Sequence, residues 1–94
     1  MPIGMVGHVG DGNFHVGFFL KTEEDVEIAT AASERMVRRA LALDGTCTGE
    51  HGVGLGKKQY LVDELGAGTV ELMKSIKNLM DPLGLFNPGK LYPD

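Results

Sequence analysis

Cysteine, tryptophan and long apolar runs are scarce or absent in this chain of 94 residues, which has one cysteine and no tryptophan. The single cysteine, Cys47, excludes an internal disulfide and fits a reducing compartment. No run of about 20 apolar residues and no signal-peptide pattern is found, so we expect a soluble protein. The net charge of -4 gives no reason to expect nucleic acid or an anionic membrane as a partner.

Glycine is abundant, with 14 residues gathered mainly at 4–17, 45–56 and 84–89. Ordered glycine costs chain entropy, so dense clusters usually mark tight turns or close approaches of the backbone to a ligand. The first two clusters contain all three histidines of the chain. The candidate ligands and catalytic side chains are therefore concentrated in these two segments.

The first cluster places two histidines around a turn, in Gly7-His8-Val9-Gly10-Asp11-Gly12-Asn13-Phe14-His15. Asp-Gly is a strong signal for a two-residue hairpin loop, and strands over 5–10 and 13–20 would then place His8 directly opposite His15. Cross-strand Cβ atoms lie about 5 Å apart, and zinc binds imidazole nitrogen at about 2.0–2.1 Å. The spacing therefore predicts half of a metal site.

These residues also have simpler interpretations. Either histidine taken alone is more often structural than a ligand, and it is the pair that favours metal binding. Asp11 and Asn13 are most simply turn residues, although Asp11 could orient a ligating imidazole. Large side chains on both faces of the hairpin predict that it is covered on both sides.

A long helix is predicted after the hairpin. Thr22 is a good N-cap, acidic residues follow it, and the helix should run to about Leu43 and stop at Asp44-Gly45. Apolar and small residues recur at helical spacing on one face. They are Val26, Ala29, Ser33, Met36, Val37, Ala40 and Leu41.

The second half of the chain predicts two shorter helices. One is expected near 57–65, and the other over 70–80, capped by Thr69 and ended by Asp81-Pro82. Residues 46–56 should begin like a strand and continue as a glycine-rich loop, and the C-terminal tail has only turn chemistry. The predicted fold class is α+β, an antiparallel β-hairpin with one long and two shorter helices.

Glu50 and His51 add to the chemistry of the second cluster. Catalytic zinc sites commonly have three protein ligands, and Glu50 is the best third candidate. Gly49 and Gly52 would let this backbone approach the hairpin closely. Neighbouring side chains of an extended segment point to opposite faces, which favours His51 as a base beside the metal and not as a ligand.

Two other chemistries have little support. A phosphate loop needs Gly six residues before Lys57 and Ser or Thr after it, but His51 and Lys58 occupy those positions. Nothing in the sequence indicates a lowered pKa for Cys47 as a nucleophile.

Three motifs together resemble one enzyme family. They are GHVGDGNFH at 7–15, GTCTGEHGVG at 45–54 and DPLGLFNPGK at 81–90. In this order they resemble the C-terminal part of FAD-linked 2-hydroxyacid dehydrogenases, most closely the cytochrome-type D-lactate dehydrogenases. Glycolate oxidase flavoprotein subunits and D-2-hydroxyglutarate dehydrogenases are near relatives. The resemblance covers nearly the whole chain.

The resemblance implies that the chain is a fragment of a flavoenzyme. Residues 1–56 would be the hairpin, helix and active-site loop of the cap domain, and residues 57–94 the C-terminal helices and tail. FAD would be bound mainly by an N-terminal domain that this chain lacks, so we expect the isolated 94 residues to be inactive. The parent would lie in the cytoplasm or at the inner membrane, mitochondrial in a eukaryote.

The resemblance also assigns site residues. It implies that His8, His15 and Glu50 bind a divalent metal, that His51 is the base, and that Asn87 and Lys90 approach the flavin.

The implied reaction oxidises a small D-2-hydroxy acid, D-lactate or glycolate, to the 2-oxo acid, with a cytochrome, a quinone or an electron-transfer flavoprotein as electron acceptor. Two histidines and a carboxylate suit zinc, manganese or iron alike. A free-standing metal-binding module without catalysis and a purely structural piece with inert histidines are the alternatives.

Overall fold

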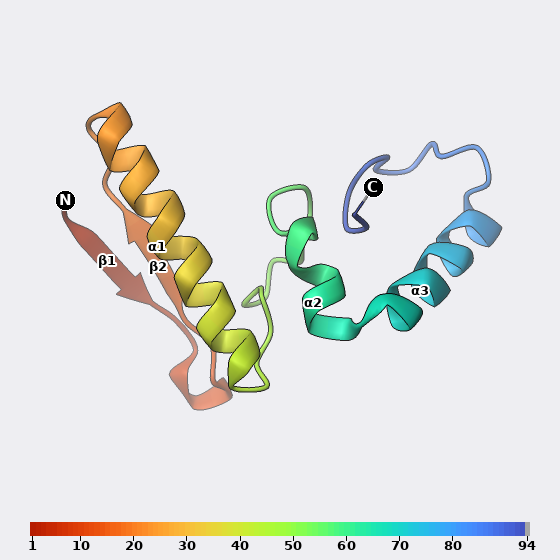
Figure 1. Cartoon of the computed structure of the whole chain (residues 1–94), viewed down its shortest axis with the longest axis horizontal. Helices are drawn as coiled ribbons and strands as arrows, with labels where there is room; N and C mark the ends of the chain where they lie inside the picture. Colours follow the sequence, from red (N-terminus) through yellow and green to blue (C-terminus); the bar gives the residue numbers. More distant parts are fainter. Residues whose placement is uncertain (94) are drawn as a thin grey trace. The chain divides into compact units, whose positions relative to one another are not determined.

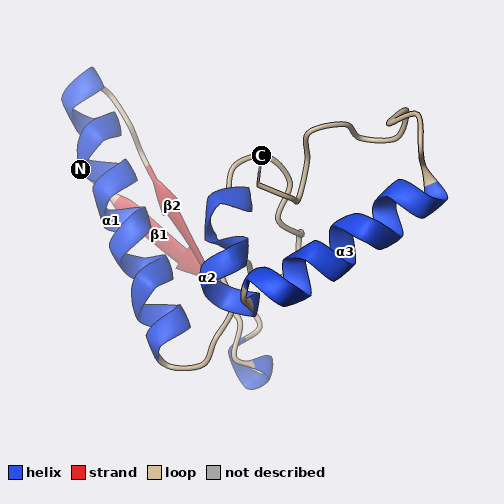
Figure 2. Cartoon of the chain, turned by 45° about the vertical axis from the view of Figure 1, so that its right-hand side comes forward, coloured by secondary structure: helices blue, strands red, loops and turns tan. Residues whose placement is uncertain are grey.

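The computed structural model describes residues 1–93, and the chain divides into two compact units with the boundary between Glu50 and His51. The first unit contains strands β1 (Ile3–Val6) and β2 (His15–Phe18) and helix α1 (Glu23–Ala42) (Figure 1). The second contains the short helix α2 (Leu61–Leu65), helix α3 (Ala67–Met80) and an irregular tail (Figure 2). The predicted α+β class is confirmed.

Strands β1 and β2 form an antiparallel pair whose register differs from the prediction. Val6, and not His8, lies opposite His15. The chain leaves the ladder at Gly7 because a single 3₁₀ turn (Val9–Asp11) replaces the two-residue loop, with Asp11 N donating to His8 O at 2.9 Å. A side chain at position 7 would collide with the backbone of Asn13 and Phe14. Glycine at position 7 therefore lets the segment after β1 pass close to the segment before β2.

Helix α1 has the predicted start and end and most of the predicted buried face. The hydroxyl of Thr22 accepts a hydrogen bond from Asp25 N at 3.1 Å, as an N-cap does. At the other end, Asp44 has a left-handed φ of 62° and Gly45 N donates to Ala40 O at 2.7 Å. Ala29 and Val37 are buried, whereas Val26 is exposed.

The hairpin is not covered on both sides as predicted. In Figures 1 and 2 helix α1 runs beside the two strands, but all four residues of β1 are exposed. A single amphipathic helix has one apolar face, so it covers one side of a two-stranded sheet. The strand-like start predicted at residue 46 is also wrong, since residues 46–56 contain no strand.

Helix α3 begins three residues earlier than predicted. Gly66 adopts φ 85°, and its carbonyl accepts the first helical hydrogen bond from Val70 N at 3.2 Å. Thr69 therefore lies inside the first turn and does not cap the helix. Helix α2 packs against α3, and a 3₁₀ turn (Lys58–Tyr60) precedes it. The core of this unit consists of Tyr60, Leu61 and Val70.

Within residues 1–93, no helix combines the length and the hydrophobicity needed to cross a lipid bilayer.

Substitution of Leu61, which is 3% exposed, should destabilise the second unit. We expect Leu61→Ala to lower the free energy of unfolding by about 2–5 kcal/mol, because it leaves a cavity in a small core. Leu72→Ala is the matched control, since Leu72 on α3 is 61% exposed. Urea unfolding followed by circular dichroism measures both, and equal losses would contradict the assigned core.

Candidate functional site

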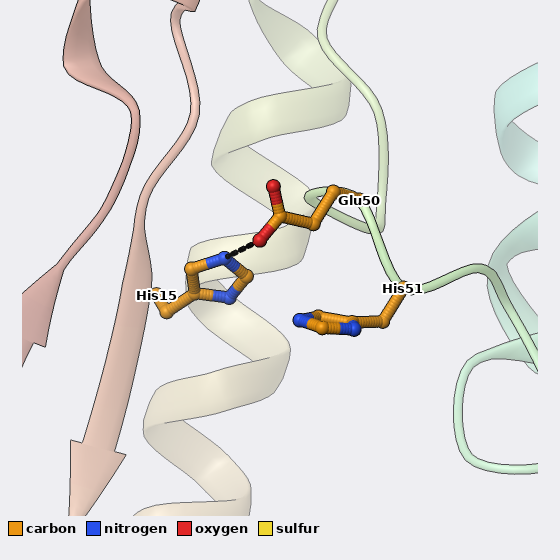
Figure 3. Close-up of side chains that lie close together, drawn as sticks. All are labelled: His15, Glu50 and His51. Carbon is orange, nitrogen blue, oxygen red and sulfur yellow. Dashed lines mark hydrogen bonds and ion pairs between the residues drawn. The ribbon is translucent and has the colours of Figure 1, made fainter.

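The carboxylate of Glu50 lies between two imidazole rings. Its Oε2 is 3.0 Å from His8 Nδ1, and its Oε1 is 3.2 Å from His15 Nε2. Figure 3 shows the contact between Glu50 and His15. His8 precedes the 3₁₀ turn, His15 begins β2, and Glu50 is the last residue of the first unit. The structure thus brings the three predicted ligands together within one unit.

The two histidines meet at Glu50 although they are not cross-strand partners. His8 lies outside the ladder, and its carbonyl accepts hydrogen bonds from Asp11 N at 2.9 Å and Asn13 N at 3.1 Å. These bonds fold residues 8–13 back on themselves. The conformation of the turn therefore sets the position of His8, whereas β-pairing sets that of His15.

Gly49 allows the Glu50 segment to approach the hairpin. A Cβ added at residue 49 would lie 2.9 Å from Asn13 Nδ2 and 3.2 Å from His15 Cε1. The close approach predicted for Gly49 is confirmed. Gly52 belongs to the second unit, and its φ of 85° is a backbone conformation that favours glycine; its approach to the hairpin stays a prediction.

Asn13 contributes more to this site than the sequence predicts. Its side-chain oxygen accepts a hydrogen bond from His8 N at 3.4 Å, and its amide group faces Gly49. The sequence marks Asn13 only as a turn residue, because its contact with Gly49 joins segments 36 positions apart. No local pattern carries that information.

The side chains of His8, His15 and Glu50 are of the types that bind a divalent metal. On a tetrahedral zinc ion with bonds of about 2.0–2.1 Å, neighbouring ligand atoms lie roughly 3.3 Å apart. The two nitrogen–oxygen separations at Glu50, 3.0 and 3.2 Å, run to different oxygens of the carboxylate, and the group of ligand atoms that lie within 4.8 Å of one another does not include His8. Imidazole nitrogen and carboxylate oxygen are also ligands that zinc, manganese and iron share. The same contacts can equally form a hydrogen-bonded cluster without an ion.

His51 follows Glu50 directly and is exposed at the start of the second unit (Figure 3). Residues 49–51 form a bend and not an extended segment, so the argument that neighbouring side chains point to opposite faces does not apply. The role of His51 as a base stays a prediction.

Asn87 and Lys90 lie in the tail of the second unit. Lys90 Nζ donates to Asn87 Oδ1 at 2.9 Å, and Asn87 has a left-handed φ of 46°. The two side chains thus belong to one local turn. Their contact with a flavin stays a prediction.

Residues 1–91 match the protein family described as FAD linked oxidases, C-terminal domain. Because this match extends over nearly the whole sequence, the chain belongs to that family.

Individual relatives are named as hydroxyacid oxidoreductases. The chain is 51% identical over 88 residues to D-lactate dehydrogenase (cytochrome) 1, mitochondrial, of Saccharomyces cerevisiae, covering 94% of this chain and 15% of that protein. It is 52% identical over 89 residues to the probable D-lactate dehydrogenase, mitochondrial, of Danio rerio, covering 93% and 18%. It is 38% identical over 88 residues to a glycolate oxidase subunit of Bacillus subtilis, covering 92% and 19%. The chain thus spans less than a fifth of the length of these curated relatives.

Substitution of Gly49 should disturb the cluster around Glu50. We expect Gly49→Ala to displace Asn13 or His15, because the added methyl group has no room beside them. The change is measured as altered ring signals of His8 and His15 in nuclear magnetic resonance spectra. Gly56→Ala is the control, since a Cβ there meets nothing within 4 Å. Unchanged ring signals in Gly49→Ala would contradict the close approach.

Proposed function

We propose that this chain is part of a flavin-dependent oxidoreductase that oxidises a small D-2-hydroxy acid, D-lactate or glycolate, to the corresponding 2-oxo acid. The family match over residues 1–91 supports the flavin, and the names of the relatives support the substrate class. The observation that carries the proposal to particular residues is the Glu50 carboxylate held between His8 and His15.

We assign His8, His15 and Glu50 as the ligands of a divalent metal. When bound, the metal supplies a Lewis acid for the substrate's oxygen atoms, and FAD supplies the acceptor of the hydride. Both histidines contact the Glu50 carboxylate without an ion present, which supports the assignment. Their partial exposure leaves room for a small acid to reach them.

His51 is the proposed base. Oxidation of the hydroxyl group to a carbonyl requires loss of the hydroxyl proton as the hydride leaves the adjacent carbon, and an imidazole nitrogen can take that proton near neutral pH. Its position directly after Glu50 keeps this ring tethered to the ligand set. Asn87 and Lys90 are the proposed contacts of this chain to the flavin.

The names of the relatives support proposals for the electron acceptor and the location. A cytochrome is favoured over a quinone or an electron-transfer flavoprotein because the Saccharomyces cerevisiae relative carries the word cytochrome in its name. Two of the relatives described above are named as mitochondrial, which favours a mitochondrial location if this chain is eukaryotic.

A metal-binding module without catalysis is the second candidate function. It is favoured by one observation: His8, His15 and Glu50 all lie in the first unit. Such a module would take up metal without a flavin.

Removal of a ligand should weaken metal binding by this chain. We expect zinc affinity to fall at least tenfold in His8→Ala, His15→Ala and Glu50→Ala, measured by isothermal titration calorimetry with zinc, because each change removes a ligand atom. Glu71→Gln, on the exposed surface of α3, should bind zinc like the unaltered chain. Equal zinc affinity in Glu50→Ala, or no zinc uptake by the unaltered chain, would refute the ligand assignment.

Substitution of the proposed base should abolish turnover without loss of metal. The test uses a chimera in which residues 1–91 replace the matching segment of the Saccharomyces cerevisiae relative. His51→Ala should lower the oxidation rate of D-lactate by about 10²–10⁴-fold, the usual contribution of a general base. Metal content, measured by mass spectrometry, should equal that of the parent chimera. An unchanged rate would show that His51 is not the base.

A further inference from the structure

Asp81, at the C-terminal end of α3, holds the start of the tail. Its side chain is 7% exposed, although no function has been assigned to it so far. One carboxylate oxygen accepts a hydrogen bond from Leu85 N at 3.0 Å, and the other accepts one from Phe86 N at 3.0 Å. Lys77 Nζ also donates to the carboxylate and, at 3.0 Å, to Phe86 O. We call Lys77, Asp81 and the backbone of residues 85–86 the carboxylate clip.

The charge state of Asp81 agrees with these contacts. Hydrogen bonds from the Lys77 ammonium group and then from the amides of Phe86 and Leu85 lower the pKa of Asp81 to about 2. At neutral pH the carboxylate is therefore ionised, which is the form that accepts these hydrogen bonds.

The far end of the same segment is attached to the glycine-rich loop. Leu91 N donates to Gly54 O at 2.8 Å, and Lys58 Nζ donates to Gly89 O at 3.1 Å. The carboxylate clip holds residues 85–86, and these bonds hold residues 89–91. The turn with Asn87 and Lys90 lies between the two attachments, and its two side chains are joined at 2.9 Å.

Hydrophobic burial does not hold this turn in place. Leu85 and Phe86 are each 70% exposed. The backbone is in the left-handed region at Gly84, Asn87, Gly89 and Leu91, and Leu91, unlike glycine or asparagine, adopts it only when surrounding contacts enforce it. Polar attachments supply those contacts. The turn also borders a cavity of about 370 Å³, which Asp81, Asn87 and Lys90 help to line.

We propose that Asp81 is a positioning residue, which acts through the backbone of residues 85–86 to keep Asn87 and Lys90 in the arrangement that contacts the flavin. This inference rests on the proposed function. In this role Asp81 touches neither flavin nor substrate. The tail then has a defined conformation that its hydrogen bonds to Asp81 maintain.

The test measures FAD affinity in the chimera defined above, by the change in flavin absorbance on titration of the flavin-free protein. Asn87→Ala and Lys90→Ala should each raise the dissociation constant of FAD, and Asp81→Asn should raise it about tenfold. Glu71→Gln is the control, because it removes the same charge from the exposed face of the same helix. It should leave FAD affinity unchanged.

A combined variant separates positioning from general stability. If Asp81 acts through Asn87 and Lys90, then adding Asp81→Asn to a variant that already carries Asn87→Ala and Lys90→Ala should weaken FAD binding no further. If the substitutions instead raise the dissociation constant of FAD by independent, multiplying factors, Asp81 only stabilises the unit and the inference is overturned. Should Asp81→Asn fail to fold, Lys77→Gln, which removes one donor of the carboxylate clip and keeps the carboxylate, takes its place in the same cycle.

The two possible failures are distinguishable. If Asn87→Ala and Lys90→Ala weaken FAD binding but Asp81→Asn does not, the positioning role is wrong and the proposed flavin contact survives. If neither Asn87→Ala nor Lys90→Ala changes FAD affinity, the proposed flavin contact itself is wrong.

Discussion

The candidate site depends on one carboxylate, that of Glu50, which is shared between two imidazole rings. The sharing requires His8 and His15 to reach Glu50 from separate parts of the hairpin, at 3.0 and 3.2 Å. A glycine at position 49 favours it, because a side chain there would press on the amide group of Asn13 and lie in tight contact with the ring of His15. The glycine clusters of the sequence thus serve the site directly, since they allow the backbone to come close where ligand atoms must converge.

The second unit uses a carboxylate in a comparable way. Asp81 accepts hydrogen bonds from two backbone amides and a lysine, and so fixes a tail whose apolar side chains are largely exposed. In each unit a short polar network adds to the few buried apolar side chains. This is expected of a chain whose buried residues are few and whose glycine content is high.

Local signals in the sequence predict much of the fold. Contacts between residues far apart in the sequence are harder to predict. The N-cap at Thr22 and the end of α1 follow from interactions within a few residues, and they are confirmed. The register of the hairpin was wrong because Asp11 and Gly12 entered a 3₁₀ turn instead of a two-residue loop. The grouping of His8, His15 and Glu50 was nevertheless foreseen. The contact between Asn13 and Gly49 was not, because the turn pattern at Asn13 says nothing about a partner 36 residues away.

X-ray absorption spectroscopy of this chain loaded with one equivalent of zinc tests the central claim most directly, because it measures the ligand atoms themselves. The account predicts two imidazole nitrogens at about 2.0–2.1 Å and a carboxylate oxygen at about 2.0–2.2 Å. A sulfur ligand at about 2.3 Å, which would have to come from Cys47, or a shell of water oxygens alone, would contradict it.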